Sequence, residues 1–369
     1  MKYAAQACDS MNALRLQQSA NNRRNRIMAE TWESLFIKQA NREGHSQPYI
    51  DECLRYKSAL DARNMPIIFD VGHLACHIGW SENGLYYLLS HIDANYETYG
   101  IRKKSDPNST RTITAPSASL KQVQWWVYNS LLTRDERISV YAQGFVERRG
   151  IKTNALTHEG AVWLLTLDLK DFFDNIYANR VYNYFVSLGY EAKVCWALTA
   201  ICTYEGHLPQ GAPTSPYLSN LLSREMDEEI AHYCAANGLV YSRYADDIAI
   251  SSNDRNRIPS VNEIRQIVEQ NGFKLNHKKT KLQHKGQKME VTGLTIGAGV
   301  HVPKSYRNEI LRELHFCEKY TPTVHSQTMY PDKMFYKEWL LGRIQFVRSI
   351  DSDAGDKMLA RFNKLNWIL

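Results

Sequence analysis

Residues Tyr244–Ser251 read YADDIAIS, and this stretch decides how the middle of the chain folds. The apolar runs Leu239–Tyr244 and Ile248–Ser252 predict two short strands, with the Asp246-Asp247 doublet at the tight turn between them. Adjacent like charges between apolar strands are unfavourable unless a cation lies nearby. A bare Asp-Asp doublet is more often a surface turn, because Asp favours turns, so the neighbouring segments decide between the two interpretations.

A third carboxylate lies upstream, near the end of another apolar run. Trp163–Leu169 reads WLLTLDL and predicts a buried strand that carries Asp168. If this strand neighbours the other two, Asp168 meets Asp246 and Asp247 at one edge of a sheet. Mg²⁺ binds through a few carboxylates plus substrate phosphates, and two such ions about 3.5–4 Å apart stabilise both oxygens of a phosphoryl displacement. For Asp168 alone, the alternative is a helix N-cap.

The surrounding segments alternate between helical and extended patterns. Asp70–His91 predicts two short helices split at Ser81–Gly84, and Tyr96–Pro116 predicts a hairpin around a polar Asp-Pro-Asn-Ser turn. Ser219–Asn237 predicts one long helix, and Lys274–Leu282 reads as extended. This order of elements predicts an α+β fold in which helices cover one face of an antiparallel sheet.

Composition and charge are those of an ordinary globular protein. Hydrophobic residues make up 44% of the 369 residues and charged residues 23%, so disorder is not expected as the main state. The net charge of +6 is a mild excess, but Lys274–Lys288 carries several lysines and no acidic residue. Clustered cations are typical of proteins that bind a phosphate backbone, although a lone run of charges is often a solvated surface.

Cysteine usage and hydropathy point to the cytoplasm. The seven cysteines are scattered and include no C-x-x-C pair, so neither a disulfide framework nor a zinc site is expected. The first residues lack the apolar core of a signal peptide, and no run approaches the ~20 apolar residues of a membrane helix. We therefore expect a soluble, cytoplasmic protein that has no membrane partner.

Three segments taken together resemble the palm of reverse transcriptases. LDLKDFF (Leu167–Phe173) is similar to the first catalytic motif, LPQGAPTSPYLSN (Leu208–Asn220) to the motif beside the incoming nucleotide, and YADD (Tyr244–Asp247) to the second catalytic motif. Two further segments resemble elements of retron reverse transcriptases. Asn154–His158 matches N-A-x-x-H and Val291–Gly293 matches V-T-G. The chain is therefore identified as a bacterial retron reverse transcriptase, a retron-type RNA-directed DNA polymerase.

The resemblance implies a right-hand polymerase fold of fingers, an antiparallel palm sheet and a helical thumb. The expected domains are an N-terminal helical extension (1–65), fingers with interspersed palm elements (66–162), a palm with the catalytic motifs (163–300) and a helical, RNA-binding thumb (301–369). By the same resemblance, the catalytic, metal-binding residues that hold two Mg²⁺ ions are Asp168, Asp246 and Asp247.

A group of nucleotide-binding residues is implied as well. Phe173 would lie under the sugar of the incoming dNTP and exclude a 2′-hydroxyl, whereas Phe172 would be a plain core aromatic. Gln210 and Gly211 would line the nucleotide pocket, where glycine lets backbone approach the base pair closely. The alternative for this segment is an ordinary helix-entry loop.

Several cations are implied at the triphosphate. Lys103 and Arg111 would grip it from the fingers, although this chain has Ser105–Asn108 where many members of the family carry a Gly pair after Lys-Lys. That difference leaves open which cation touches phosphate. A general acid for pyrophosphate release is the last implied role, and its candidates are Lys281 and its rivals Lys278 and Lys279. A contact to the nucleic-acid backbone is the alternative role for these lysines.

The resemblance also implies a structured non-coding RNA as partner. The residues expected to recognise it are Asn154, His158, Val291, Thr292 and Gly293, although for His158 a structural role is the more common one. The implied activity is reverse transcription of part of this RNA into branched msDNA, primed by a 2′-hydroxyl, with a separate effector protein and a role in antiphage defence. The alternatives are a reverse transcriptase of group II intron, diversity-generating or abortive-infection type, or a nucleic-acid-binding scaffold.

Overall fold

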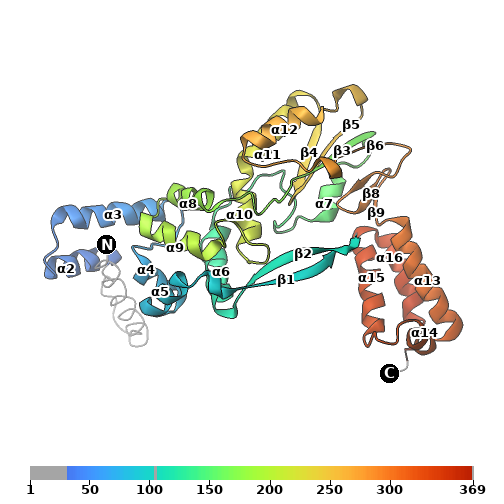
Figure 1. Ribbon diagram of the computed structural model, residues 1–369, viewed down its shortest axis with the longest axis horizontal. Helices are drawn as coiled ribbons and strands as arrows, with labels where there is room; N and C mark the ends of the chain where they lie inside the picture. Colours follow the sequence, from blue (N-terminus) through green and yellow to red (C-terminus); the bar gives the residue numbers. More distant parts are fainter. Residues whose placement is uncertain (1–30, 104–105, 368–369) are drawn as a thin grey trace. The chain divides into compact units, whose positions relative to one another are not determined.

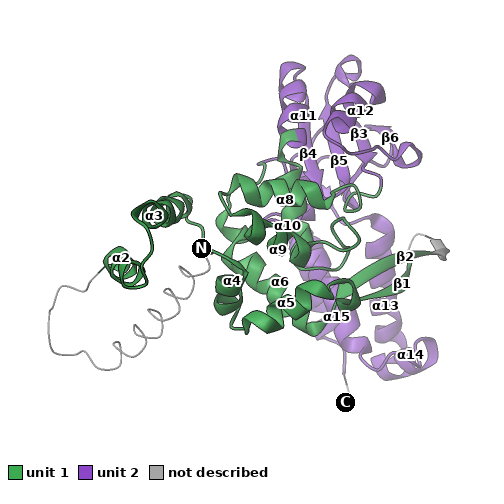
Figure 2. Cartoon of the chain, turned by 60° about the vertical axis from the view of Figure 1, so that its left-hand side comes forward, with its two compact units in different colours: residues 1–139, 171–225 green, residues 140–170, 226–369 purple. Residues whose placement is uncertain are grey.

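The chain forms two compact units that are interleaved along the sequence (Figures 1 and 2). The computed structural model describes residues 31–103 and 106–367. Unit 1 combines residues 1–139 with 171–225, and unit 2 combines residues 140–170 with 226–369. Neither unit is therefore a continuous stretch of sequence. Within the described ranges, no helix has the length and apolar character needed to span a bilayer.

Unit 1 is mainly helical and carries one long β-hairpin. Its helices are α2 (Trp32–Arg42), α3 (Gln47–Asp61), α4 (Val71–Ile78), α5 (Glu82–Ser90), α6 (Ala118–Ser130), α8 (Ala178–Ser187), α9 (Ala192–Cys202) and α10 (Ser215–Leu222). Strands β1 (Tyr96–Lys103) and β2 (Asp106–Pro116) form the predicted antiparallel hairpin. The predicted Asp-Pro-Asn-Ser turn is wrong, because Lys103 already pairs with Asp106 and these residues belong to β2.

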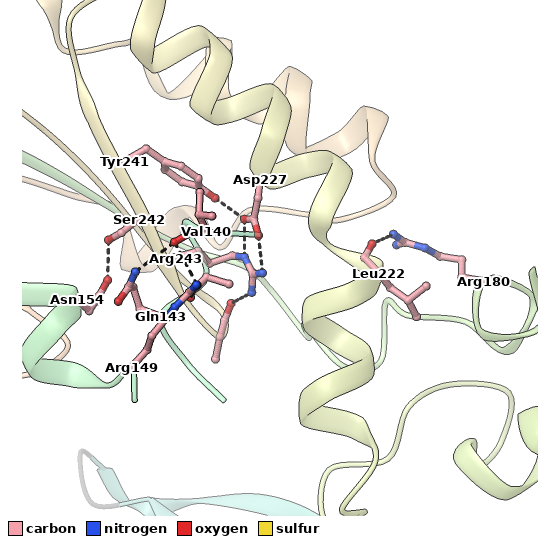
Figure 3. Close-up of polar contacts among 12 residues, drawn as sticks. Val140, Gln143, Arg149, Asn154, Arg180, Leu222, Asp227, Tyr241, Ser242 and Arg243 are labelled. Atoms are coloured by element: carbon pink, nitrogen blue, oxygen red, sulfur yellow. Dashed lines mark hydrogen bonds and ion pairs between the residues drawn. The ribbon is translucent and has the colours of Figure 1, made fainter. Parts of the chain in front are cut away.

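Two helix boundaries in unit 1 differ from the prediction for physical reasons. The break in Asp70–His91 comes earlier than predicted, because Gly79 ends α4 with a φ of 82° and Ser81 already caps α5 by accepting a hydrogen bond from Gly84 N. The long helix predicted over Ser219–Asn237 is two helices. It breaks where the Arg180 guanidinium donates to the Leu222 carbonyl at 2.6 Å, which competes with the helical hydrogen bond (Figure 3).

Unit 2 is built on a four-stranded antiparallel sheet in the order β4-β5-β3-β6. Its strands are β3 (Trp163–Asp168), β4 (Val240–Tyr244), β5 (Asp247–Ser252) and β6 (Lys281–His284). Helices α7 (Ile151–Leu156), α11 (Arg224–Ala236) and α12 (Val261–Gln270) accompany it. Tyr241 and Arg243 of β4 contact α11, whereas Ser242 contacts α7 from the opposite face. Helices therefore lie on both faces of β4, whereas the sequence predicted helices on only one face of the sheet.

The segment that precedes β6 is not continuously extended, contrary to the prediction. A single 3₁₀ turn, η4 (His277–Lys279), interrupts it. The turn forms because Asn276 N donates to the Asp168 carbonyl at 2.8 Å and Lys279 N then donates back to the Asn276 carbonyl at 3.0 Å. This places the side chains of Asn276 and Lys279 beside Asp168.

A small sheet and four helices complete unit 2. Strands β7 (Glu290–Val291), β8 (Leu294–Ile296) and β9 (Val300–His301) form the sheet, and α13 (Lys304–Tyr320), α14 (Pro322–Met329), α15 (Tyr336–Ile350) and α16 (Ser352–Asn363) form the C-terminal helices (Figure 1). One hydrophobic core runs from Leu164 of β3 through Leu294 to Leu340 of α15. Helices α15 and α16 touch at Gly355, where a Cβ atom would lie 2.3 Å from Cα of Arg348.

Candidate active site

Three carboxylates meet at one edge of the four-stranded sheet. Asp168 is the last residue of β3 and Asp247 the first residue of β5, and the two lie directly opposite each other in the antiparallel register. Asp246 precedes Asp247 in the turn, and its carbonyl accepts a hydrogen bond from Leu169 N at 2.8 Å. The sequence prediction that strand and doublet are neighbours is therefore confirmed.

The turn that carries the doublet is tight. Ala245 has a φ of 56°, a left-handed conformation that non-glycine residues seldom adopt. Gly144 packs directly against it, because a Cβ atom there would lie 2.9 Å from Ala245 N. The strained residue is thus held by close packing on one side, and its neighbours on β4 and β5 fix the two ends of the turn.

Opposite charge and hydrogen bonds surround Asp168, which is 5% exposed. Lys279 Nζ lies 2.7 Å from its Oδ2, and Asn276 Nδ2 donates to its Oδ1 at 3.1 Å. Burial disfavours the charged form of Lys279, but the hydrogen bond to Asp168 and the charges of the three aspartates outweigh this and raise the pKa of the lysine. The structure therefore places Lys279, rather than Lys281, against the carboxylates.

The pKa of Asp247 reflects the short distances between the three acids. This side chain reaches solvent, yet it lines a cleft in which the surrounding protein removes much of its hydration. That desolvation, together with the negative charges of Asp246 and Asp168, raises the pKa of the Asp247 carboxyl to about 6, although Lys279 opposes the shift. A divalent cation at this edge would relieve the same repulsion.

The cleft beside the carboxylates has a volume of about 590 Å³ and lies within unit 2. Its lining combines Asp168 and Asp247 with Lys278, Lys279 and Lys281 and with residues Val291–Gly293. Oxygen-only donors suit a hard divalent cation. Among the residues that the structure describes, no group of three or more His, Cys, Asp or Glu side chains already encloses a metal position. A metal ion held by these carboxylates would have its remaining coordination positions open to water or to substrate phosphates.

A chain of buried hydrogen bonds joins the N-A-x-x-H element to the sheet. The ring of His158 contacts Ser251 Oγ at 2.7 Å through Nδ1 and Ser242 Oγ at 2.8 Å through Nε2. Ser242 Oγ in turn donates to Asn154 Oδ1 at 2.6 Å. Because Ser242 and Ser251 belong to β4 and β5, this chain fixes α7 to the two strands that flank the Asp246-Asp247 turn.

The same chain reaches the V-T-G element. Asn154 Nδ2 donates to Thr292 Oγ1 at 3.4 Å, and Thr292 lies in a left-handed turn with a φ of 47°. His158 and Asn154 are each 1% exposed, and His158 does not line the cleft, so direct RNA contact by the His158 ring, as the sequence suggested, does not fit the structure. Val291 is buried as well, at 2%. Asn154 and all three V-T-G residues line the open cleft, and Thr292 and Gly293 are the more accessible of these.

The segment expected at the incoming base pair is pinned to the hairpin of unit 1. The Gln210 carbonyl accepts a hydrogen bond from Thr114 N at 2.9 Å. Gly211 has a φ of 138°, and a Cβ atom there would lie 2.6 Å from the Thr114 carbonyl oxygen. Only glycine fits at this close approach, so part of the requirement for Gly211 comes from the fold of unit 1 itself.

The remaining nucleotide-binding candidates also belong to unit 1. Phe172 is 4% exposed, as expected of a core aromatic, and its ring centroid lies 5.4 Å from that of the half-buried Phe173. The backbones of Lys103 and Arg111 belong to the hairpin, but both side chains lie outside the part of the chain that the structure describes.

Sequence reasoning missed several residues that shape this site. Arg243 and Asp227 form a fully buried ion pair, and Asn276 binds Asp168. A signal for the pair was present, since Arg243 interrupts an apolar strand and Asp227 lies one helical turn before the apolar Ile230. Nothing in the sequence marks Asn276, because its role depends on the 3₁₀ turn that follows it.

Known proteins resemble this chain over most of its length. Residues 101–296 match the family described as reverse transcriptase (RNA-dependent DNA polymerase). The chain is 32% identical to the Retron Ec86 reverse transcriptase of Escherichia coli over 84% of its own length and 94% of that protein. It is 29% identical to the Retron Mx162 reverse transcriptase of Myxococcus xanthus over 79% of its length and 66% of that protein. The structure of apo telomerase from Candida tropicalis is similar with a TM-score of 0.44 and 12% identity, covering 74% of this chain and 59% of that one.

The buried ring of His158 predicts a pH-dependent stability. Burial lowers its pKa to about 4 from the ordinary 6.5, so the unfolded chain binds the proton more readily. The stability contributed by the neutral ring is complete above pH 6.5 and is lost as the pH falls towards 4. We expect about 2 kcal/mol of the unfolding free energy to be lost between about pH 7 and pH 5 through this group, and His158→Gln to abolish that part.

Denaturant unfolding of the wild type and of His158→Gln at both pH values measures this effect. Other titrating groups act equally on both proteins, so the difference between the two proteins isolates His158. A difference that stays constant between the two pH values would contradict the prediction.

Proposed function

This chain belongs to the reverse transcriptases of retrons and is an RNA-directed DNA polymerase, and we propose that its chemistry takes place at the edge where Asp168 faces Asp247. Its α+β fold, with an antiparallel sheet and a helical C-terminal region, is the right-hand polymerase fold. Reverse transcriptases generally use divalent metal ions. The observation that carries the proposal is that Asp168 and Asp247, with Asp246 adjacent in the turn, lie at a cleft that is also lined by lysines.

The reaction joins a deoxynucleotide to a nucleic-acid hydroxyl. The hydroxyl oxygen attacks the α-phosphorus of a dNTP and loses its proton to water, a new phosphodiester bond forms, the bond between the α-phosphorus and the α,β-bridging oxygen breaks, and pyrophosphate leaves with that oxygen. Asp168, Asp246 and Asp247 would hold two Mg²⁺ ions, which would neutralise charge on the transferred phosphoryl group and on both reacting oxygens. The crowding that raises the pKa of Asp247 supports a cation-binding role for the three acids.

The strand that provides the hydroxyl would lie in the cleft of unit 2. Thr292 and Gly293 line this cleft together with Asp168 and Asp247. We propose that these residues contact the RNA, while Asn154 and His158 act by holding the V-T-G turn in place. The RNA would be a structured non-coding RNA, and the first hydroxyl would be the 2′-hydroxyl of an internal nucleotide, which gives branched msDNA.

Membership of the retron family supports the wider assignment. We propose a role in antiphage defence together with a separate effector protein. In the terms of the polymerase hand, 66–162 would contribute the fingers with interspersed palm elements, 163–300 the palm, and 301–369 an RNA-binding thumb. Residues 1–65 would be an N-terminal extension, of which α2 and α3 lie among the described residues.

Two further residues would act on the incoming dNTP. Lys279, beside Asp168, would donate the proton to the departing pyrophosphate, a role for which the sequence favoured Lys281. Phe173, half-buried next to the core residue Phe172, would lie under the sugar and exclude ribonucleotides. Gln210 and Gly211 would line the same pocket, and Lys103 and Arg111 would bind the triphosphate.

The first prediction from the proposed function concerns the product that copurifies with the protein. We expect the wild type, expressed with its own RNA, to carry DNA covalently joined to RNA, and its mobility after RNase treatment to shift when a debranching enzyme is added. Asp246→Asn should still copurify with RNA but contain at least about a hundredfold less DNA, because metal-assisted charge stabilisation is lost.

Each outcome tests a different part of the proposal. Linear DNA alone from the wild type would remove the 2′-priming assignment, and normal DNA content in Asp246→Asn would remove the catalytic role of the doublet. A scaffold protein would show RNA without DNA in both.

The second prediction separates the candidate lysines. Lys279→Ala should slow single-nucleotide addition about a hundredfold, which is typical for loss of a general acid, whereas Lys281→Ala should cost much less. Lys281 is the matched control, since it lines the same cleft from the exposed face of β6, whereas the ion pair with Asp168 is formed by Lys279. Single-turnover kinetics over a range of pH provide the measurement, and a larger defect in Lys281→Ala would restore the assignment made from sequence.

The third prediction concerns sugar selectivity. Phe173→Ala should incorporate ribonucleotides at least about tenfold more readily relative to dNTPs, because the ring no longer excludes the 2′-hydroxyl. Phe172→Ala is the control: loss of this buried ring should lower thermal stability by about 3 kcal/mol or more without changing sugar selectivity. Unchanged selectivity in Phe173→Ala would argue against the proposed position of its ring.

A further inference from the structure

We propose that Arg243 is a positioning residue that sets the geometry of the Asp246-Asp247 turn through the Ala245 carbonyl, a role that rests on the proposed metal-binding function of that turn. Arg243 does not itself reach the cleft, because its side chain is completely buried. Its guanidinium hydrogen-bonds both to the turn, at the Ala245 carbonyl, and to Asp227 of helix α11, and Figure 3 shows its contact with Asp227.

The first part of the evidence is a bidentate ion pair. Arg243 donates from Nε to Asp227 Oδ1 at 2.7 Å and from Nη2 to Asp227 Oδ2 at 2.7 Å. Tyr241 OH donates to the same Oδ1 at 2.6 Å. Both charged side chains have 0% exposure, so the pair is shielded from water and its geometry is fixed by the fork of the guanidinium.

The second part is the remaining nitrogen of the guanidinium. Arg243 Nη1 donates to the Ala245 carbonyl at 3.0 Å. Ala245 is the left-handed residue of the turn, with a φ of 56°, and its carbonyl belongs to the peptide that leads into Asp246. The orientation of that peptide determines the backbone positions from which the side chains of Asp246 and Asp247 project. Arg243 thereby couples the rigid helix α11 to the backbone of the doublet.

The backbone of Arg243 is held as firmly as its side chain. Gln143 N donates to the Arg243 carbonyl at 2.7 Å, and Arg243 N donates to the Tyr141 carbonyl at 2.9 Å. Arg149 secures this extra segment by donating from Nη1 to the Ala142 carbonyl at 2.7 Å. Gly144 follows immediately and packs on Ala245 N. The turn is therefore held by the side chain of Arg243 and by the packing of residues 141–144.

Stability alone does not account for this arrangement. Two charges buried in a protein lose their hydration energy, and the attraction between them compensates for this loss only in part. A protein in which well-packed apolar residues of similar volume replace such a pair is often equally stable or more stable. The hydrogen bond to the Ala245 carbonyl gives the buried arginine a positional role that apolar residues could not take over. A lysine could not do so either, since one ammonium cannot hold both carboxylate oxygens in a planar fork while reaching the carbonyl.

The test measures Mn²⁺ binding to the full chain without nucleic acid, by electron paramagnetic resonance, beside the thermal midpoint. The wild type should bind Mn²⁺ more tightly than Asp247→Asn, which lacks one carboxylate. Arg243→Lys should bind about tenfold more weakly than the wild type, as expected when a group that orients metal ligands is lost. Arg180→Lys is the matched control, because Arg180 is also a shielded arginine that donates to a carbonyl, in unit 1, and it should keep the affinity of the wild type.

A triple variant separates position from stability. Tyr241→Phe combined with Asp227→Leu and Arg243→Met removes the buried charges and the hydroxyl that depends on them. Its thermal midpoint should recover towards that of the wild type, whereas its Mn²⁺ affinity should stay about tenfold weaker. Recovery of both properties would show that Arg243 serves stability only and would overturn the proposal.

Hydrogen exchange supplies an independent local readout should the triple variant fail to fold. The amide of Leu169 donates to the Asp246 carbonyl at 2.8 Å and therefore reports on the turn. In Arg243→Lys this amide should exchange at least about tenfold faster, while amides of helix α12 remain unchanged. Unaltered protection of Leu169 together with the Mn²⁺ affinity of the wild type would refute the role of Arg243. Equal Mn²⁺ binding by the wild type and Asp247→Asn would instead refute the proposed carboxylate site and, with it, this inference.

Discussion

Mutual repulsion among Asp168, Asp246 and Asp247 is the constraint to which the rest of unit 2 responds. Antiparallel pairing of β3 with β5 forces two of these acids into opposite positions, and the turn adds the third. The chain compensates with cations and donors of its own, above all Lys279 and Asn276 at Asp168. The balance is incomplete, since the pKa of Asp247 remains raised to about 6. A divalent cation at this edge would relieve the residual repulsion.

The strand β4 shows how buried polar residues hold such an edge in place. Its alternation sends Tyr241 and Arg243 to the side of α11, where both bind Asp227. It sends Ser242 to the opposite side, where it joins the chain of hydrogen bonds through His158. Two separate hydrogen-bond networks thus hold β4 in place, one on each of its faces. Both lie away from solvent, and both act on the adjoining turn through backbone position rather than through chemistry of their own.

Much of this could be predicted from the sequence, and the rest depended on contacts between distant residues. Local patterns identified the strands around Asp246-Asp247 and the hairpin within Tyr96–Pro116, because the spacing of apolar residues acts over a few positions. The same patterns could not reveal that Arg180 divides the predicted long helix, that Asn276 turns back onto Asp168, or that Lys279 rather than Lys281 lies at the acids. The family resemblance made His158 a candidate for RNA contact beside the more common structural role, and its burial at 1% comes from packing against β4 and β5, which the motif does not reveal.

The interleaving of the two units has a consequence for how the protein is made. During translation β3 leaves the ribosome with neither of its neighbours, because β5 and β6 follow only after α8–α11 have been synthesised. The apolar residues of β3 therefore remain without their partner strands while residues 171–225 of unit 1 are synthesised. Pairing between strands so distant in the chain is slow and leaves strand edges open to wrong partners. Neither unit can be produced alone by simple truncation, because each combines two separate stretches of the chain.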